Sequence, residues 1–137
     1  MKQFSQVTWR NAMTFDATTA TGQHVTMDSA AEGKTSHGPT PVELVMTALA
    51  GCTAMDVVSI LTKMREPLEG LEVETRGVRR EQEPRIFTHI EVVYHLKGKV
   101  KSESVERAIA LSRSKYCTVE GMLEKSADIT TRYEITP

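Results

Sequence analysis

The sequence is poor in cysteine and in aromatic residues, and it has no excess of charge of either sign. Only two of its 137 residues are cysteines, 5% are aromatic, and 17 Lys and Arg balance 18 Asp and Glu. Proteins that bind nucleic acids gather basic residues on one face, because phosphate backbones are densely negative. The near-neutral balance therefore argues against nucleic acid as a partner.

The N-terminus lacks a readable secretory signal. Residues 1–6 carry one charge, and no apolar run follows them. We therefore expect a cytoplasmic location. In a reducing compartment, two cysteines are more often free thiols than a structural disulfide.

The sequence also lacks a convincing membrane span. Its most apolar stretch, residues 44–61, is interrupted by Asp56 and several small polar residues, whereas a span needs about 20 predominantly apolar residues. A helix that is apolar nearly all round is more simply a buried helix. We predict such a helix here and expect no membrane partner.

The order of the predicted elements indicates the α+β class. Thr40 can cap a helix that has Pro41 in its first position and Glu43 as the capping-box partner, and we predict this helix to about Met64. Alternate residues from 86 to 96 share one apolar face of a strand. The other predicted elements are strands at 7–9, 13–15, 25–27, 71–80 and 129–135, and helices at 103–111 and 116–124. The length fits a single domain, residues 1–137.

Cys52 lies in the middle of the long helix, among small residues. Apolar burial disfavours the thiolate, so a reactive Cys52 needs a cation or a hydrogen-bond donor from elsewhere. An inert core cysteine is the simpler interpretation, since free Cys is among the most buried residue types. Asp56, one turn further on, would either oppose a thiolate or hold an arginine that serves both groups.

Cys117 follows Lys115 and lies near a predicted helix start. Both features favour a thiolate, and the functional and inert interpretations are equally open. The 64 residues between Cys52 and Cys117 exclude a CxxC redox motif and a close-set zinc pattern, but not two thiols that meet in space.

The histidines are scattered along the chain, at His24, His37, His89 and His95. His89 and His95 are six residues apart on one predicted strand, too far for one metal ion. A metal site would require both cysteines and at least one histidine, and we assign none. A Cys–His hydrolase has no local signature either.

Four segments together resemble the OsmC/Ohr superfamily, and its YhfA-type branch in particular. They are residues 38–44 (GPTPVEL), 51–61 (GCTAMDVVSIL), 84–90 (PRIFTHI) and 115–117 (KYC). The resemblance implies an α+β, OsmC-like fold in which antiparallel sheets wrap around a long central helix. It also implies an intertwined homodimer with two equivalent sites at the interface.

The resemblance further implies a thiol-dependent peroxidase that reduces organic hydroperoxides and counters oxidative stress. Cys52 would attack the peroxide oxygen and become a sulfenic acid, and Cys117 would condense with it to a disulfide. A dithiol reductant, such as a lipoyl group or a thioredoxin-type donor, would reduce that disulfide. No bound cofactor is expected.

Family members use a glutamate and an arginine to activate the first thiol. Glu43 is the candidate glutamate, but it precedes Cys52 by nine residues instead of the family's ten. On an ideal helix, nine residues place Glu43 about half a turn away from Cys52. Arg10 is the candidate arginine. Alternatives near the predicted hairpin turn are Arg79, Arg80 and Arg85.

A cavity lined by Met46, Leu49 and Met55 would favour hydrophobic peroxides. The alternative function is a non-catalytic OsmC-like dimer that binds a small apolar or thiol-reactive ligand while both cysteines stay reduced. Asp56 beside Cys52 and the displaced glutamate favour that alternative. A purely structural dimer is a third interpretation.

Overall fold

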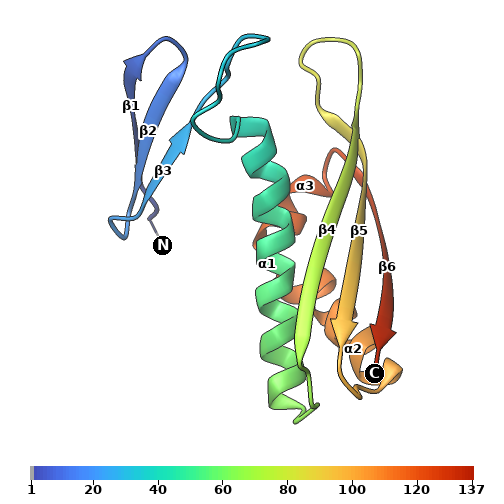
Figure 1. Cartoon of the computed structure of the whole chain (residues 1–137). Coiled ribbons are helices and arrows are strands. Elements are labelled where there is room, and N and C mark those ends of the chain that lie inside the picture. Colours follow the sequence, from blue (N-terminus) through green and yellow to red (C-terminus); the bar gives the residue numbers. More distant parts are fainter. Residues whose placement is uncertain (1) are drawn as a thin grey trace. The chain divides into compact units, whose positions relative to one another are not determined.

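The computed structural model describes residues 2–137, and the chain divides into two compact units between Val45 and Met46. The first unit contains one small sheet and the loop that follows it (Figure 1). The second contains another sheet and most of the helical residues. The two sheets and the long helix confirm the α+β class.

The sheet of the first unit has three antiparallel strands in the order β1-β2-β3. They are β1 (Ser5–Asn11), β2 (Thr14–Thr19) and β3 (His24–Met27), and they extend the three short strands predicted from the sequence. Every residue of β1 is exposed, including Val7 and Trp9. β1 therefore contributes no side chain to a core within this chain.

Helix α1 (Pro41–Lys63) begins with the predicted capping box. The Glu43 N–H donates to Thr40 Oγ1 (3.1 Å), and the Thr40 N–H donates to Glu43 Oε1 (2.9 Å). These reciprocal bonds satisfy two backbone donors that the first turn leaves free. Arg65 follows the helix in the left-handed region (φ 59°), a conformation that commonly terminates helices.

One side of α1 is buried, which corrects the prediction of a helix buried all round. Its buried residues follow one another at intervals of four: Leu49, Thr53, Val57 and Leu61. That spacing places them on one face, and Met55 outside it is 76% exposed. Among the described residues, α1 is the one helix long and apolar enough to cross a membrane, and 22% of its most apolar window is buried.

The second unit has a three-stranded sheet in the order β4-β5-β6. Its strands are β4 (Gly70–Arg79), β5 (Phe87–Lys97) and β6 (Asp128–Thr136). The predicted hairpin of β4 and β5 is antiparallel, but β6 runs parallel to β5. A parallel neighbour needs a crossover connection. This connection consists of α2 (Ser102–Leu111), the π-helix η1 (Ser112–Tyr116) and α3 (Thr118–Leu123).

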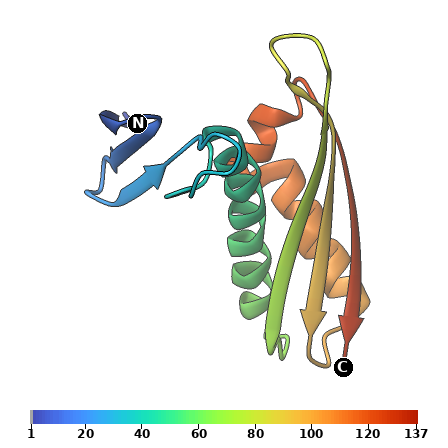
Figure 2. The ribbon, with the colours of Figure 1, turned by 45° about the horizontal axis from the view of Figure 1, so that its top comes forward.

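The helices of the second unit lie on one face of its sheet, and the core lies between the two layers (Figure 2). The predicted apolar face of β5 is buried at Ile90, Val92, Tyr94 and Leu96. Thr88, predicted for the same face, is exposed beside the hairpin tip, whereas Val93 of the opposite face is fully buried. The predicted face is therefore buried from Ile90 to Leu96, but burial does not alternate at Val93.

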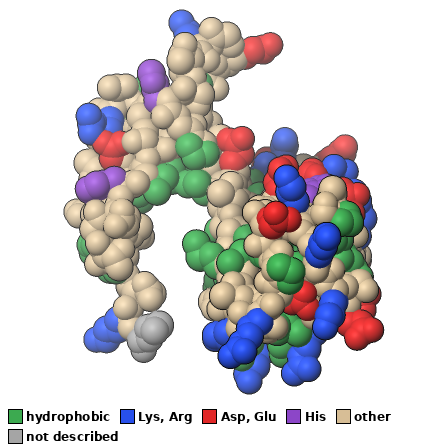
Figure 3. All heavy atoms as spheres, turned by 60° about the horizontal axis from the view of Figure 1, so that its bottom comes forward, with side chains coloured by type: hydrophobic (Ala, Val, Ile, Leu, Met, Phe, Trp, Pro, Cys, Tyr) green, Lys and Arg blue, Asp and Glu red, His purple; other side chains and the backbone are tan. Residues whose placement is uncertain are grey.

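The opposite face of this sheet carries charged side chains. His95 of β5 contacts Glu74 of β4 through Nε2 and Glu134 of β6 through Nδ1. Arg76 also pairs with Glu74 at 3.0 Å. The hydrogen bond to Glu74 raises the pKa of His95, with Glu134 acting in the same direction against partial desolvation. On the surface seen in Figure 3, basic and acidic side chains likewise lie side by side.

Because the pKa of His95 is raised in the folded state, its protonated form stabilises the fold. This contribution is fully present below the unfolded pKa of about 6.5 and is lost as the pH rises through the folded value. We expect His95→Gln to lower the free energy of unfolding more at about pH 6 than at about pH 9 in denaturant titrations. In a Glu74→Gln/Glu134→Gln background, that pH-dependent difference should vanish. Equal losses of stability at both pH values would contradict a raised pKa of His95 in the folded state.

Candidate functional site

The two cysteines meet in the second unit. The sulfur atoms of Cys52 and Cys117 and a carboxylate oxygen of Asp56 all lie within 4.8 Å of one another. Both cysteines are free thiols; Cys52 is half-buried and Cys117 is buried. The structure thus brings together two residues that 64 positions separate in the sequence.

Cys52 and Asp56 reach this site because both belong to α1 and are four residues apart. Side chains at this spacing lie one above the other on a helix face. Thr53, next to Cys52, points into the core and is buried. Cys52 therefore lies at the border between the buried stripe and the more exposed side of α1.

Cys117 reaches the site through the π-helix η1. Its backbone N–H donates to the Ser112 carbonyl (2.7 Å), five residues earlier, which closes the wide turn. Cys117 is then the N-cap of α3, and its sulfur accepts a hydrogen bond from the Glu120 N–H (3.4 Å). The predicted position at a helix start is confirmed, whereas the π-turn had no sequence signal that could have revealed it.

A buried chain of hydroxyl groups leads to Asp56. Tyr94 Oη lies 2.7 Å from Thr53 Oγ1, Thr53 Oγ1 lies 3.0 Å from Ser112 Oγ, and Ser112 Oγ donates to Asp56 Oδ2 (2.9 Å). Because Ser112 gives its single proton to Asp56, Thr53 donates to Ser112 and Tyr94 donates to Thr53. Burial raises the pKa of Tyr94 to about 12, which keeps this first donor protonated.

Sequence reasoning missed Thr53, Tyr94 and Ser112. One signal was available: Thr53 is a polar residue at the four-residue spacing of the buried stripe of α1. A buried hydroxyl group needs a hydrogen-bond partner, so this position indicated a polar contact in the core. The partners themselves come from β5 and η1, at sequence separations of 41 and 59 residues. No local pattern connects such positions.

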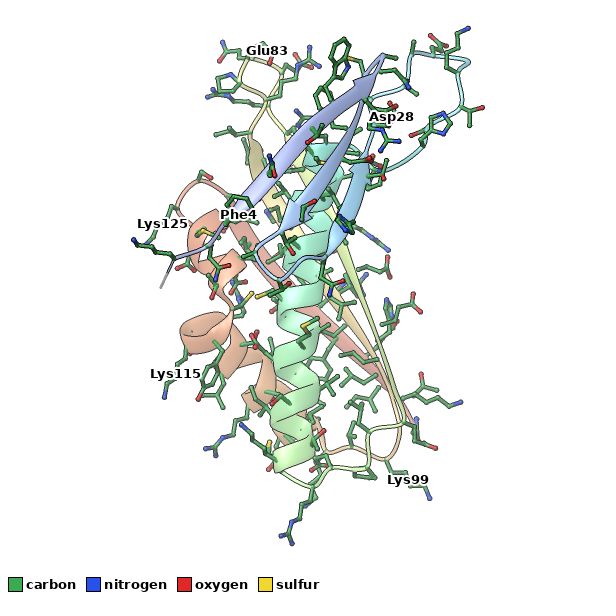
Figure 4. The ribbon with its side chains drawn as sticks, turned by 90° about the vertical axis from the view of Figure 1, so that its left-hand side faces the viewer. Phe4, Asp28, Glu83, Lys99, Lys115 and Lys125 are labelled. Atoms are coloured by element: carbon green, nitrogen blue, oxygen red, sulfur yellow. The ribbon has the colours of Figure 1, made fainter. Side chains whose placement is uncertain are left out.

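The surroundings of Cys117 disfavour its thiolate, which corrects the expectation drawn from Lys115. Burial raises the pKa of Cys117 to about 12, and the neighbouring Cys52 and Asp56 act in the same direction against the Glu120 N–H. Lys115 Nζ lies over the ring of Tyr116, 5.4 Å from its centroid. Figure 4 shows Lys115 pointing away from α1.

An ion pair between the partly exposed Arg113 and the buried Glu120 holds the first turn of α3. Glu120 is 3% exposed, and Arg113 Nε lies 3.1 Å from its Oε1. Arg113 Nη2 also donates to the Ile129 carbonyl of β6 (2.7 Å). Burial raises the pKa of Glu120, and the charge and hydrogen bond of Arg113 offset part of that effect. The pair therefore ties the turn that carries Cys117 to the sheet.

Two predicted activating residues, Arg10 and Glu43, lie in the first unit. Arg10 is exposed on β1 and pairs with Asp16 of β2. Glu43 is also exposed, and its carboxylate serves the capping box with Thr40. The three alternative arginines lie at the tip of the β4–β5 hairpin, where Arg79 and Arg80 donate to backbone carbonyls. An activating role for any of them stays a prediction.

The three predicted substrate-contacting residues have different surroundings. Leu49 belongs to the buried core, and Met46 packs against that core. Met55 is 76% exposed on another side of α1. Their role in binding a substrate stays a prediction.

Residues 32–132 match the family model described as OsmC-like protein. The chain belongs to the OsmC-like family. It is 42% identical over 132 residues to Protein YhfA of Escherichia coli (strain K12), a match that covers 96% of each chain. The OsmC-like assignment thus rests on nearly the whole sequence, and it confirms the resemblance stated from the motifs.

Solved structures show the same OsmC-like fold. A hypothetical protein from Aquifex aeolicus VF5 aligns with a TM-score of 0.89 at 29% identity, covering 99% of this chain and 97% of that one. The organic hydroperoxide resistance protein OhrB of Bacillus subtilis aligns with a TM-score of 0.65 at 15% identity, covering 98% of each chain. At that identity the second likeness establishes the fold alone.

Removing Arg113 should destabilise the fold, because Glu120 would remain buried without its partner. We expect Arg113→Met to lower the free energy of unfolding by about 1–3 kcal/mol, measured by chemical denaturation, because water already screens the partly exposed arginine. The double variant Arg113→Met/Glu120→Met removes both charges and should recover most of the loss. A single variant as stable as the original protein would show that the pair does not hold α3.

Proposed function

We propose that this protein is a thiol-dependent peroxidase that reduces organic hydroperoxides, with Cys52 as the attacking and Cys117 as the resolving thiol. The observation that carries the proposal is the approach of the two sulfur atoms to within 4.8 Å. The fold shared with a hydroperoxide resistance protein supports it. The activity belongs to a cytoplasmic response to oxidative stress.

The chemistry uses the two thiols, an activating group for Cys52 and an external reductant. The Cys52 thiolate attacks the terminal peroxide oxygen, the O–O bond breaks to give the Cys52 sulfenic acid, and the alkoxide takes a proton from water and leaves as the alcohol. The Cys117 sulfur then attacks the Cys52 sulfenic acid, and water leaves as the disulfide forms. A dithiol, such as a lipoyl group or a thioredoxin-type protein, restores both thiols by exchange.

Exposure favours this division of roles. Cys52 is half-buried and within reach of a substrate, whereas Cys117 is 5% exposed. A raised pKa keeps Cys117 a thiol until a sulfenic acid forms beside it. Arg10 and Glu43 are the proposed activating pair for Cys52, and Met46, Leu49 and Met55 the proposed contacts of a hydrophobic peroxide.

The active form is an intertwined homodimer in which residues 1–137 act as one OsmC-like domain. Two exposed apolar surfaces support this assembly. One lies on β1, with Val7 and Trp9, and the other on α1, with Met55 and Val58. Surfaces of this kind are usually covered in a stable protein, and a small chain gains buried area by dimerisation.

Asp56 supports a second candidate function. Its carboxylate, close to both sulfur atoms, opposes negative charge on them. This arrangement suits a non-catalytic OsmC-like dimer that binds a small apolar or thiol-reactive ligand and keeps both cysteines reduced.

Titration of the reduced protein with cumene hydroperoxide separates these two functions. We expect one Cys52–Cys117 disulfide per chain, detected by intact mass and peptide mapping. Cys52→Ser should abolish the reaction, while Cys117→Ser should react once and stop at the sulfenic acid. Intact thiols under excess peroxide would refute the peroxidase and favour the binding protein.

The homodimer is tested by Met55→Asp, which places a charge on the exposed side of α1. We expect light scattering to give a dimer for the original protein and a monomer for the variant, because burying an unpaired carboxylate is costly. Lys99→Asp puts the same carboxylate at an exposed polar position and should leave the dimer intact. A monomeric original protein would contradict the assembly.

A further inference from the structure

The cluster of Cys52, Cys117 and Asp56 has a second chemical property. It offers two sulfur atoms and one carboxylate oxygen that converge from α1 and the start of α3. Sequence reasoning required a histidine for a metal site, and the structure brings a carboxylate to that place instead. The geometry points to a binding site for one thiophilic divalent cation of the zinc class, formed by these three residues in the reduced protein.

The distances suit such a cation after small side-chain rotations. Zinc binds cysteine sulfur at about 2.3 Å and carboxylate oxygen at about 2.0–2.2 Å, so two sulfur ligands of a tetrahedral ion lie roughly 3.8 Å apart. All three ligand atoms already lie within 4.8 Å of one another. Closing that difference needs a movement of about 1 Å or less, which χ rotation supplies.

The groups that hydrogen-bond to the ligands are already ordered. Ser112 Oγ donates to Asp56 Oδ2 (2.9 Å), which leaves the other carboxylate oxygen for a metal ion. The Glu120 N–H points at the sulfur of Cys117 (3.4 Å). Metal sites depend on outer partners of this kind to orient the ligands. Here the partners are fixed by the hydroxyl chain and by the helix start.

The charges of the cluster also favour a cation. Cys117 is a thiol in the free protein, and a bound dication would release its proton and offset the repulsion among the two thiolates and the carboxylate. A carboxylate beside a peroxidatic thiol is unfavourable, whereas a carboxylate beside two metal-bound thiolates completes the donor set. Asp56 therefore has a clearer role in a metal site than in peroxide chemistry.

Three protein ligands leave a fourth coordination position open. Asp56 borders an open cavity of about 520 Å³, which α1, α2 and η1 line with residues that include Lys63, Arg107 and Tyr116. Of the three ligands, Asp56 alone lines this cavity, so solvent reaches the site at its carboxylate. Binding needs no peroxidase activity; if the proposed peroxidase holds, the cation and the Cys52–Cys117 disulfide exclude each other.

Cobalt and zinc titrations of the reduced full-length protein test the site without peroxide. We expect one zinc ion per chain in native mass spectrometry and a sulfur-to-cobalt charge-transfer band with cobalt. Ser112→Ala should weaken zinc affinity by about 10–100-fold, as loss of an outer partner does. Asp56→Asn should weaken it by at least about 10-fold. Glu124→Gln, on an exposed acid after α3, is the matched control and should bind as the original protein does.

Two outcomes would overturn the site. One is the absence of the cobalt–sulfur band in protein whose two thiols titrate as reduced. The other is unchanged zinc affinity in both Asp56→Asn and Cys117→Ser, which would leave only adventitious binding to a single thiol. The peroxide reaction, run separately with a chelator present, reports on the peroxidase alone, so the two proposals fail independently.

Discussion

A buried chain of hydroxyl groups holds together the three elements that surround the cysteines. Tyr94 of β5, Thr53 of α1 and Ser112 of η1 are all buried, and each hydrogen-bonds to the next before Ser112 reaches Asp56. A buried polar group left without its partner costs about 1–3 kcal/mol. The chain therefore fixes how α1 lies against η1, and the distance between the two sulfur atoms depends on that register.

The wide turn of η1 completes this arrangement. Its backbone bond from Cys117 to Ser112 spans five residues, so Ser112 faces Asp56 while Cys117 stands at the beginning of α3. The ion pair of Arg113 and Glu120 ties the same segment to β6. π-turns are often found at functional sites, and here the turn allows one short segment to supply both a positioning hydroxyl and a thiol.

Asp56 is the residue at which the chemistry of the site is decided. Near two sulfur atoms, its charge opposes a thiolate, and its oxygen would complete the ligand set of the proposed zinc-class cation. The balance between these roles depends on which cation lies beside the thiols. A guanidinium would favour reaction with peroxide, whereas a metal ion would hold both thiols in the reduced state. The proposed homodimer would also affect these roles of the site. A partner chain that covers the exposed apolar side of α1 would change the surroundings of the half-buried Cys52.

The sequence by itself determined the helix that begins at Pro41, the β4–β5 hairpin, the order of the elements and the OsmC-like family, because capping boxes, alternation and motifs are local patterns. It could not determine that β6 runs parallel to β5 or that α1 buries only one stripe, since both depend on which surfaces meet. It also could not reveal that Thr53, Tyr94 and Ser112 form a hydrogen-bonded chain, or that Lys115 lies over the ring of Tyr116. Only the tertiary structure decided the site, because hydrogen bonds and burial join residues that lie 41 to 59 positions apart in the chain.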